Sequence, residues 1–599
     1  MAAISDRGPR HRPGSVRLGV LLAAVLATGA GVSLTPAAQA TTAPVRRAEA
    51  LPTRTPIKHV IVVVGENHSY DNVFGTWRPP AGEQVRNLLS EGIVTDGGGC
   101  GLAGARATQR QALDVDSYHV TPLTTGPYLT LPRPDTTSAK GQPADVPDAR
   151  FPAVLPNCPY RITQYVPYPN AYVGDPIHRF YQMWQQVDGG RNDLWVWTAN
   201  TAGFDNGAVP PQPIHQGDLQ MGYYSMSAGD APVLRFLADH YASSDNYHQP
   251  VMGGTGANSI VLGTGDPASY QDAAGRPARP PDNQIENPNP KPGTNNNFTQ
   301  DGYSGGSYSN CSDRSQPGVG AISAFLDSHP VFRDGDCAPG TYYLLNNYDP
   351  GYLADGRPAP LGPDHFTVPP QRFPTIADAL GSRRISWAYY AEGWNNGNPT
   401  PAYCGICDPM QYATSIMTNP AQRRNLKGYE QFVADVAAGT LPAVSFVKPG
   451  GDNDGHPASS TLSRFEGFTA DVVRRVLAQP RLFASTAIMV TVDEGGGYYD
   501  SGYIEPVSFF GDGTRIPMLV ISPYARAGHV DHTYADHVSV LKFIEQNWRL
   551  SPLSSRSTDN LPNPITGDGD AYLPTNAPAI GDLTSLFDFG HRRVDTPAP

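Results

Sequence analysis

Short runs of nonpolar residues, rich in valine and isoleucine, recur along the chain. Their hydrophobicity is nearly continuous rather than alternating, which is typical of strands in a mostly parallel sheet buried on both faces. Clear runs lie at 59–64, 444–447, 487–492 and 516–521, and weaker ones at 342–345 and 385–390. We therefore predict a central sheet built from these segments.

Nonpolar residues at helical spacing lie between the predicted strands. One set comprises Phe468, Val472, Val473 and Val476, and a second comprises Val538, Leu541, Ile544 and Trp548. Each set covers one face of a helix and predicts packing on a core. Strands that alternate with helices indicate an α/β fold.

Two long segments, near 95–170 and 266–340, show neither pattern. The chain holds 62 glycines and 60 prolines among 599 residues, about a fifth, where roughly 12% is usual. Hydrophobic residues still make up 39%, so we predict a folded protein with long loops and exclude coiled coils and helical bundles. We expect one domain over 41–599 that carries the two segments as insertions.

The N-terminus has the features of a targeting segment. Four arginines precede a nonpolar run at 18–34, and an Ala-Gln-Ala sequence follows at 38–40. This pattern predicts a signal peptide over 1–40 and a secreted or periplasmic protein, with a retained membrane anchor as the alternative. No later nonpolar run is long enough for a span, so we expect no stable membrane span after cleavage.

The net charge of the chain limits the kinds of molecule that the protein is expected to bind. The chain has 43 Lys and Arg against 55 Asp and Glu, a net charge of −12. No basic stretch stands out, so we expect no binding of nucleic acid. The sequence implies no protein partner.

Six cysteines all lie beyond the predicted signal peptide. An even number in an exported chain predicts disulfides. Proximity in the sequence favours Cys100–Cys158, Cys311–Cys337 and Cys404–Cys407. Because two residues separate Cys404 from Cys407, half of a zinc site is the alternative for that pair.

Acidic and amide side chains directly follow two of the predicted strands. Glu66 and Asn67 follow the first strand, and Asp493 and Glu494 follow the strand at 487–492. Ligands bind at the carboxyl ends of strands in open α/β sheets, and oxygen donors of these types hold cations. Three glycines at 495–497 predict a close backbone approach. The alternative is that the acidic residues only cap helices.

Thr255 lies in a glycine-rich segment before a nonpolar run. Gly253 and Gly254 precede it and Asn258 follows. A hydroxyl at a helix N-terminus suits phosphate binding and nucleophilic attack, although threonine is also an ordinary N-cap. Histidines that could protonate a leaving group or contact phosphate occur at His178, His456, His529, His532 and His537. The alternative for each histidine is structural, and Asp536 before His537 is expected to cap a helix.

These segments together resemble the bacterial phosphoesterase family, which contains phospholipases C of the non-haemolytic type and secreted acid phosphatases of the A type. The opening motif reads ENHSYDNVFG at 66–75. The resemblance continues in order at 189–193, 221–224, 253–258, 448–449, 456–457, 493–496 and 515–548. It spans most of the chain after 41 but leaves out the two insertions.

The resemblance implies an alkaline-phosphatase-like fold, with a central mostly parallel sheet and helices on both faces. It also implies that Glu66, Asn67, Asp493 and Glu494 bind a metal, and that Thr255 contacts the metal and is the nucleophile. The sequence departs from many phospholipases C at Gly495, where they have histidine. The Gly-Gly-Thr context of Thr255 is more similar to the acid phosphatase branch.

The expected protein is a secreted, metal-dependent hydrolase that acts on small phosphoesters or phospholipids through a covalent phosphothreonine. A phosphomonoesterase is preferred, and a phospholipase C that cleaves phosphatidylcholine-type diesters is the alternative. The metal is divalent: Mg, Ca, Mn, Zn or Fe. We expect His456 or His537 to donate the leaving-group proton, and the substrate to be contacted by Asn258, His178 and His532.

Two readings from other classes stay open. A non-catalytic exported binding protein on the same fold would lack the nucleophile or a metal ligand, whereas all are present here. A serine esterase is suggested by the Gly-x-Ser-x-Gly pattern at 302–306, but no strand precedes it as a nucleophile elbow requires.

Overall fold

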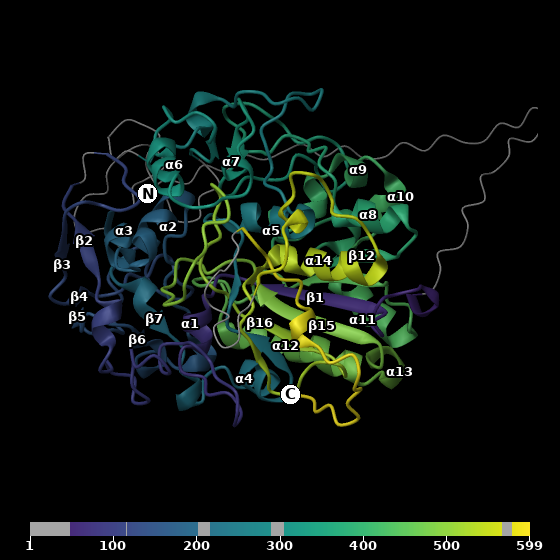
Figure 1. The fold of residues 1–599 in the computed structure, drawn as a ribbon, viewed down its shortest axis with the longest axis horizontal. Coiled ribbons are helices and arrows are strands. Elements are labelled where there is room, and N and C mark those ends of the chain that lie inside the picture. The colour runs from purple at the N-terminus through teal and green to yellow at the C-terminus, as the bar shows by residue number, and fades with distance from the viewer. Residues whose placement is uncertain (1–47, 115–116, 202–215, 289–304, 566–577) are drawn as a thin grey trace, which may run out of the picture. The chain divides into compact units, whose positions relative to one another are not determined.

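An eight-stranded sheet forms the centre of the computed structural model (Figure 1). Its strand order is β13-β12-β14-β1-β15-β16-β8-β17. The strands are β1 (His59–Gly65), β8 (Ala242–Ser244), β12 (Trp387–Ala391), β13 (Leu426–Gly428), β14 (Val444–Lys448), β15 (Thr486–Val492), β16 (Met518–Ile521) and β17 (Val530–Asp531).

The structure describes residues 48–114, 117–201, 216–288, 305–565 and 578–599. Residues 45–599 cluster into one compact unit. The predicted signal peptide, 1–40, lies outside the described residues. In the described part of the chain, no helix combines the length and the hydrophobicity that crossing a membrane requires.

The middle of the sheet is parallel, as the nonpolar runs predict. β1 lies between β14 and β15 and runs parallel to both, with Val62 opposite Phe446 and Met489. Every residue of the three strands is buried. Burial on both faces explains the continuous hydrophobicity, because no side of these strands meets water.

Two predicted strands differ from expectation. β16, within the run 516–521, is antiparallel to both β15 and β8. A continuously hydrophobic strand is expected to be buried on both faces. The pattern does not indicate whether the strand runs parallel or antiparallel to its neighbours. The run 342–345 contains β11 (Tyr343–Leu344), which pairs with β10 (Tyr308–Ser309) outside the central sheet.

Helices cover both faces of the sheet (Figure 1). On one face lie α5 (Thr255–Thr264), α8 (Ile376–Ser382) and α14 (His537–Trp548), and on the other lie α4 (Pro232–His240), α11 (Tyr429–Ala438) and α12 (Leu462–Leu477). The nonpolar stripes predicted for 468–476 and 538–548 are the buried sides of α12 and α14. The fold class predicted from the sequence is therefore confirmed.

Shorter elements surround this core. The other helices are α1 (Tyr70–Phe74), α2 (Phe180–Val187), α3 (Trp195–Thr201), α6 (Val319–Leu326), α7 (Arg333–Asp336), α9 (Thr414–Met417), α10 (Pro420–Arg423) and α13 (Pro480–Phe483). The other strands are β2 (Arg110–Ala112), β3 (Thr125–Pro127), β4 (Leu131–Pro132), β5 (Val154–Leu155), β6 (Tyr160–Arg161), β7 (Gly222–Tyr223), β9 (Tyr247–His248) and β18 (Ala535–Asp536).

All three predicted disulfides are present, joining Cys100 to Cys158, Cys311 to Cys337 and Cys404 to Cys407. The Cys100–Cys158 disulfide cross-links the segment that follows α1. The third occupies both sulfurs of the pair that could have been half of a zinc site, so that alternative is wrong for the oxidised protein.

Candidate active site

Residues that follow β1 and β15 meet at one edge of the sheet. Gly65 and Val492 are opposite each other in the parallel register, so Glu66 and Asp493 follow side by side where the two strands end. The Asn67 backbone N–H donates to Asp493 Oδ1 at 3.0 Å. Ser69, not Glu66 or Asn67, is the N-cap of α1. The helix-cap alternative is therefore wrong for Glu66 and Asn67.

The glycine turn after Glu494 packs directly against these groups. Asn67 has a left-handed backbone with φ of 55°. A Cβ on Gly496 would collide with the Cβ of Asn67, and one on Gly497 would collide with the carbonyl of Ile177. Both glycines also have positive φ, so the predicted close backbone approach is present at this turn.

Thr255 is the first residue of α5, and Gly254 is its N-cap. The Thr255 hydroxyl Oγ1 lies 3.3 Å from Glu66 Oε2 and 3.4 Å from Glu494 Oε1. The side chain is buried. Thr255 thus joins the acidic residues at the positive end of the helix dipole and does not serve as the N-cap.

The turn before Thr255 is held by the side chain of Asn258. Asn258 Oδ1 accepts from the Val251 N–H at 2.9 Å, and its Nδ2 donates to the Gly253 carbonyl at 2.8 Å. Both polar groups are engaged within the turn. Asn258 therefore shapes the backbone that presents Thr255, and its contact with substrate stays a prediction.

Lys448 is a member of the site to which the sequence assigned no role. It ends β14, the neighbour of β1, and its Nζ lies 2.7 Å from Glu66 Oε1 and 4.0 Å from Asp454 Oδ2. Burial acts to lower the pKa of Lys448, but the two carboxylates outweigh it and raise the pKa. Lys448 directly follows the nonpolar run 444–447, and a charged residue in that position is the sequence feature that could have identified it.

The oxygen atoms around Thr255 fit a bound cation. Asn67 Oδ1 and Asp493 Oδ2 are buried and have no hydrogen-bond partner among the described residues. Burial, reinforced by the charge of Glu66, raises the pKa of Asp493 well above its ordinary value. Lys448 is one cation against the carboxylates of Glu66, Asp454, Asp493 and Glu494, so a divalent ion would offset much of the remaining negative charge.

Two predicted histidines border this group. His178 is buried, with Nε2 at 3.7 Å from Glu494 Oε1 and Nδ1 at 2.6 Å from the Pro176 carbonyl. His456 Nε2 lies 3.0 Å from Asn67 Nδ2, and its Nδ1 lies 2.6 Å from the Pro457 carbonyl. The His456 side chain is 20% exposed, which makes it the member of the group that meets solvent.

The other three candidate histidines, His529, His532 and His537, have different positions. His537 is buried, with Nε2 2.6 Å from the Asp493 carbonyl and Nδ1 2.9 Å from Tyr247 Oη. Burial lowers the pKa of His537 to about 4. Its ring thus donates to one backbone group and accepts from a tyrosine, and it lies away from solvent. The role of His537 as a general acid stays a prediction. Asp536 caps α14 by accepting from the Val538 N–H, as expected.

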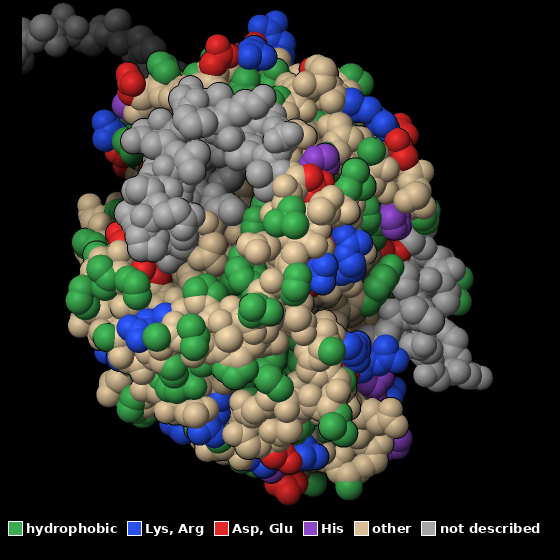
Figure 2. All heavy atoms as spheres, turned by 90° about the vertical axis from the view of Figure 1, so that its left-hand side faces the viewer, with side chains coloured by type: hydrophobic (Ala, Val, Ile, Leu, Met, Phe, Trp, Pro, Cys, Tyr) green, Lys and Arg blue, Asp and Glu red, His purple; other side chains and the backbone are tan. Residues whose placement is uncertain are grey.

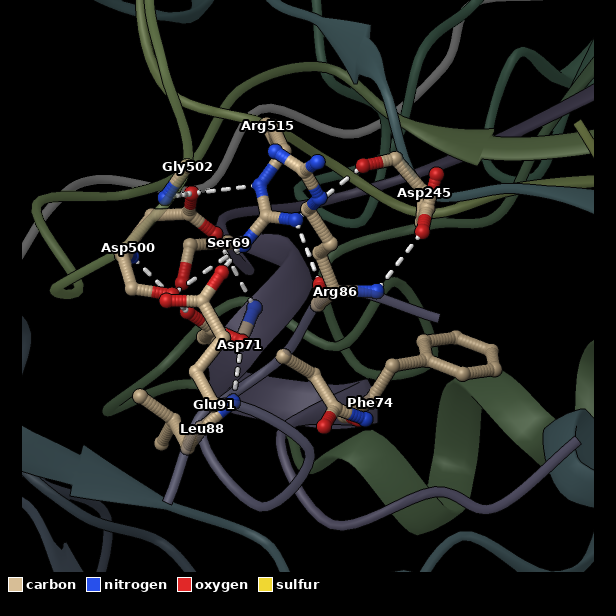
Figure 3. Close-up of polar contacts among 12 residues, drawn as sticks. Ser69, Asp71, Phe74, Arg86, Leu88, Glu91, Asp245, Asp500, Gly502 and Arg515 are labelled. Carbon is tan, nitrogen blue, oxygen red and sulfur yellow. Dashed lines mark hydrogen bonds and ion pairs between the residues drawn. The ribbon is translucent and has the colours of Figure 1, made fainter. Parts of the chain in front are cut away.

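A separate network surrounds Arg515 and includes Asp71, Asp245 and Asp500 (Figure 3). His532 Nδ1 lies 2.7 Å from Asp245 Oδ1, and the Asp245 carbonyl accepts from Arg515. Arg515 also pairs with Asp71 at 3.2 Å and Asp500 at 2.7 Å. This network connects α1 to the loop after β15, and His532 joins it through Asp245. Contact of His532 with substrate stays a prediction.

The disulfide between Cys404 and Cys407 lies against the site. Its two sulfurs and an oxygen of Glu66 are within 4.8 Å of one another, and Cys407 Sγ lies 3.2 Å from Glu66 Oε1. Because the sulfurs are bonded to each other, they offer no thiolate to a metal. Ser304 of the serine-esterase pattern lies outside the described residues.

The chain is similar to one family of known proteins over most of its length. The model of the Phosphoesterase family matches residues 57–551. Phospholipase C B of Mycobacterium tuberculosis is 24% identical over 569 residues, covering 89% of this chain and 78% of the relative. A probable acid phosphatase of Kluyveromyces lactis is 28% identical over 278 residues, covering 43% of this chain and 62% of the relative.

A solved structure from Vibrio parahaemolyticus, of a protein in the alkaline phosphatase superfamily, is also similar. It covers 54% of this chain and 62% of its own, with 10% identity and a TM-score of 0.25.

Proposed function

Because this chain belongs to the Phosphoesterase family, we propose that it cleaves phosphoric esters with Thr255 as the nucleophile and with the help of a divalent cation. Its relatives are named as phospholipase C and acid phosphatase, and the chain is a hydrolase of the same kind of bond. One observation carries the proposal: the Thr255 hydroxyl lies between Glu66 and Glu494 at the start of a helix.

The ligands of the proposed cation are Glu66, Asn67, Asp493, Glu494 and the hydroxyl of Thr255. An oxygen-rich set suits Mg, Ca or Mn, and Zn or Fe also binds such groups. When bound, the cation would polarise phosphoryl oxygens and make the hydroxyl of Thr255 more acidic.

Thr255 would attack the phosphorus in line, forming a phosphothreonine while the alcohol leaves. The N-terminus of α5 favours the negative charge of the phosphoryl group at this position. Water then hydrolyses the phosphothreonine, releasing phosphate or a phosphorylated headgroup and restoring the hydroxyl of Thr255.

His456 is the proposed donor of the leaving-group proton. It lies beside Asn67, and it is partly exposed where a leaving group would depart toward solvent. His178 Nε2 lies 3.7 Å from Glu494 Oε1, and His178 is the proposed contact to the phosphoryl group. Both roles are assigned from position: each ring is adjacent to a proposed metal ligand, and neither ring belongs to the network around Arg515.

We prefer a phosphomonoesterase. The site after Glu494 holds glycine, and a Cβ on Gly495 would collide with Thr514 Oγ1 and lie 3.2 Å from Gln249 Oε1. The histidine that many phospholipases C carry there would therefore not fit without a shift of these neighbours. The alternative, a phospholipase C, is favoured by the match of 89% of this chain to phospholipase C B.

The test is a direct comparison of substrates on the purified protein. Hydrolysis of p-nitrophenyl phosphate far above that of p-nitrophenylphosphorylcholine and phosphatidylcholine supports the monoesterase. The reverse order overturns it in favour of the phospholipase C. A brief acid quench during turnover, followed by peptide mass spectrometry, should find the phosphoryl group on Thr255. A phosphoryl group on another residue contradicts the proposed nucleophile.

We also propose that the protein works outside the cytoplasm. Three disulfides are the supporting observation, because such bonds persist in oxidising compartments. Mass spectrometry of the N-terminus of protein recovered from culture medium tests this, and a start near residue 41 is expected.

A further inference from the structure

The disulfide between Cys404 and Cys407 borders the candidate active site, and the proposed function assigns it no role. Cys407 Sγ lies 3.2 Å from Glu66 Oε1, and the two sulfurs and one oxygen of Glu66 are all within 4.8 Å of one another. Thiolates and carboxylates are typical zinc ligands, and three protein ligands leave a fourth position for water. The three groups would therefore form a metal site if the two sulfurs were thiolates.

The backbone of this segment is held in place by hydrogen bonds that do not involve the disulfide. Tyr389 Oη donates to the Cys407 carbonyl at 2.7 Å, and the Gly451 N–H donates to the Ala402 carbonyl at 3.0 Å. Tyr389 belongs to β12 and Gly451 follows β14, so the segment is attached to the central sheet at two points. Opening of the disulfide would therefore leave both sulfurs near the carboxylate.

The three disulfides differ in how much of the chain they enclose. Cys404 and Cys407 are 3 positions apart, whereas the cysteines of the other two pairs are 26 and 58 positions apart. In the chain-entropy account, a disulfide stabilises a fold more as the loop that it closes becomes longer. Reduction of the Cys404–Cys407 pair therefore costs the fold the least stability, and we expect the protein to stay folded.

The two sulfurs also differ in their access to a reductant, because Cys407 is buried and Cys404 is half-buried. A thiolate of a dithiol attacks Cys404 Sγ, the S–S bond breaks, and the electron pair leaves on Cys407 Sγ beside Glu66. The second thiolate of the dithiol then attacks the mixed disulfide and releases Cys404 as a thiolate. The dithiol is oxidised to a disulfide, the enzyme gains two electrons, and the two protons of the dithiol pass to solvent.

We infer that reduction of the Cys404–Cys407 disulfide creates a metal site, formed by the two thiolates and Glu66, for a thiophilic divalent cation such as zinc or cadmium. The two thiolates add two negative charges beside a carboxylate. Lys448, with Nζ at 2.7 Å from Glu66 Oε1, offsets one charge only, so a divalent cation is needed to offset the rest. Soft thiolate ligands favour such cations over Mg or Ca.

Occupation of this site would inhibit the enzyme, and this consequence rests on the proposed function. Glu66 Oε1 lies beside the disulfide, whereas Oε2 lies 3.3 Å from the hydroxyl of Thr255. A cation held by the thiolates draws the carboxylate toward Cys407 and away from the proposed catalytic cation. Reoxidation removes the thiolates and releases the metal, so the disulfide acts as a switch that responds to reductant and zinc together.

Cadmium binding to the purified protein tests the site without any measurement of activity. Surface carboxylates also bind cadmium, and Figure 2 shows acidic side chains at several places on one face of the molecule. The measurement must therefore be specific for sulfur, and the ultraviolet charge-transfer absorbance of cadmium–thiolate bonds has this property. The protein is treated with dithiothreitol, desalted without oxygen and titrated with cadmium.

We expect a charge-transfer band in the reduced wild type that is lost on reoxidation. The matched control is Cys404→Ser/Cys407→Ser, which keeps the other two disulfides, so that their thiols contribute equally in both proteins after reduction. Glu66→Gln keeps both thiolates, and its affinity for cadmium should be roughly tenfold or more weaker, since even a group that only supports a metal ligand contributes this much.

An equal band in the wild type and in Cys404→Ser/Cys407→Ser, or wild-type affinity in Glu66→Gln, overturns the inference. Circular dichroism shows whether the reduced proteins are folded, and alkylation followed by peptide mass spectrometry identifies the cysteines that were reduced. Loss of the fold when only Cys404 and Cys407 are reduced also overturns it. Reversal on reoxidation is measured on the wild type alone, so this part of the test does not depend on the variants.

Hydrolysis of p-nitrophenyl phosphate measures the consequence for the proposed function. Zinc should remove most of the activity of the reduced wild type, whereas reduced Cys404→Ser/Cys407→Ser should respond to zinc like the oxidised wild type. Cadmium–thiolate binding by a protein without esterase activity would leave the metal site intact and refute only the proposed chemistry. A reduced wild type that binds cadmium through this pair but keeps full activity with zinc overturns the switch.

Discussion

Lys448 and Glu66 form a buried ion pair in which Lys448 Nζ lies 2.7 Å from Glu66 Oε1. The other oxygen of the same carboxylate, Oε2, lies 3.3 Å from the hydroxyl of Thr255. The two oxygens therefore have different partners. Lys448 ends β14 and Glu66 follows the neighbouring β1, so the order of strands in the central sheet places Lys448 beside one oxygen of Glu66.

We expect Lys448→Met to lower kcat and to weaken binding of the proposed cation. Without the ammonium group, Glu66 loses the contact that fixes its orientation toward Thr255, and groups that orient a metal ligand typically contribute about 10- to 100-fold. Steady-state kinetics with p-nitrophenyl phosphate, together with metal titration by calorimetry, measures both effects.

Lys448→Arg is the matched control, since it keeps the charge and should recover part of the lost activity. Thermal unfolding of both variants separates a general loss of structure from a local effect. Wild-type kcat and metal affinity in a folded Lys448→Met protein would show that Glu66 needs no such partner.

Replacement of Thr255 should separate chemistry from folding. Thr255→Ala removes the hydroxyl and should lower kcat by at least about 10³-fold, as loss of a nucleophile does. Thr255→Ser keeps a hydroxyl at the start of α5 and should retain part of the activity. Near-wild-type hydrolysis of p-nitrophenyl phosphate by Thr255→Ala would remove Thr255 from the mechanism.

The convergence of Glu66, Asn67 and Asp493 could be predicted because parallel strands deliver the residues after them to one edge of the sheet. Thr255 at the start of a helix could be predicted from its glycines. The contact of Lys448 with Glu66 could not, because it depends on β14 lying beside β1, and the sequence does not fix strand order. Burial alone likewise left the antiparallel direction of β16 undetermined.

The histidines show a second limit of prediction from the sequence. His456 and His537 looked equivalent as candidate acids, since each follows a short polar sequence. Their roles are set by partners distant in sequence: Asn67 contacts His456, whereas Tyr247 and the Asp493 carbonyl contact His537. The orientation of an imidazole ring is a tertiary property that spacing does not encode.

Substitution of these two histidines should therefore have different effects. His456→Gln should lower kcat by about 10²-fold or more on substrates with a poor leaving group, as removal of a general acid does. The loss should shrink for p-nitrophenyl phosphate, whose leaving group needs no proton. His537→Gln should instead lower the melting temperature, because two buried hydrogen bonds are disturbed. Equal losses on both substrates for His456→Gln would argue against proton donation.

Gly496 should be intolerant of a side chain for a local reason. Gly496→Ala places a methyl group against Asn67 at a φ of 58°, and the left-handed backbone alone costs about 1–2 kcal/mol for a non-glycine residue. We expect activity to fall more than tenfold because Asn67 must move. Gly467→Ala, in the exposed face of α12 with open space around it, is the control. It should leave activity unchanged and stabilise the helix by about 1 kcal/mol.

Glu545 gives a pH-dependent test that is independent of the active site. It is buried in α14, and burial, reinforced by the neighbouring Asp559, raises the pKa of its carboxyl to about 10. In the unfolded chain the carboxyl has an ordinary pKa near 4.3. Between these two values the folded protein holds a proton that the unfolded chain has released, so the contribution of Glu545 to stability decreases as the pH rises.

Glu545→Gln removes this titration while keeping the shape and a hydrogen-bonding group. The free energy of unfolding of the variant, relative to that of the wild type, should therefore increase between pH 5.5 and pH 8.5, by about 1 kcal/mol or more. Urea unfolding at the two pH values measures the difference, and the other titrating groups cancel because both proteins share them. A relative stability that stays constant, or decreases, across this range would show that Glu545 is ionised in the folded protein.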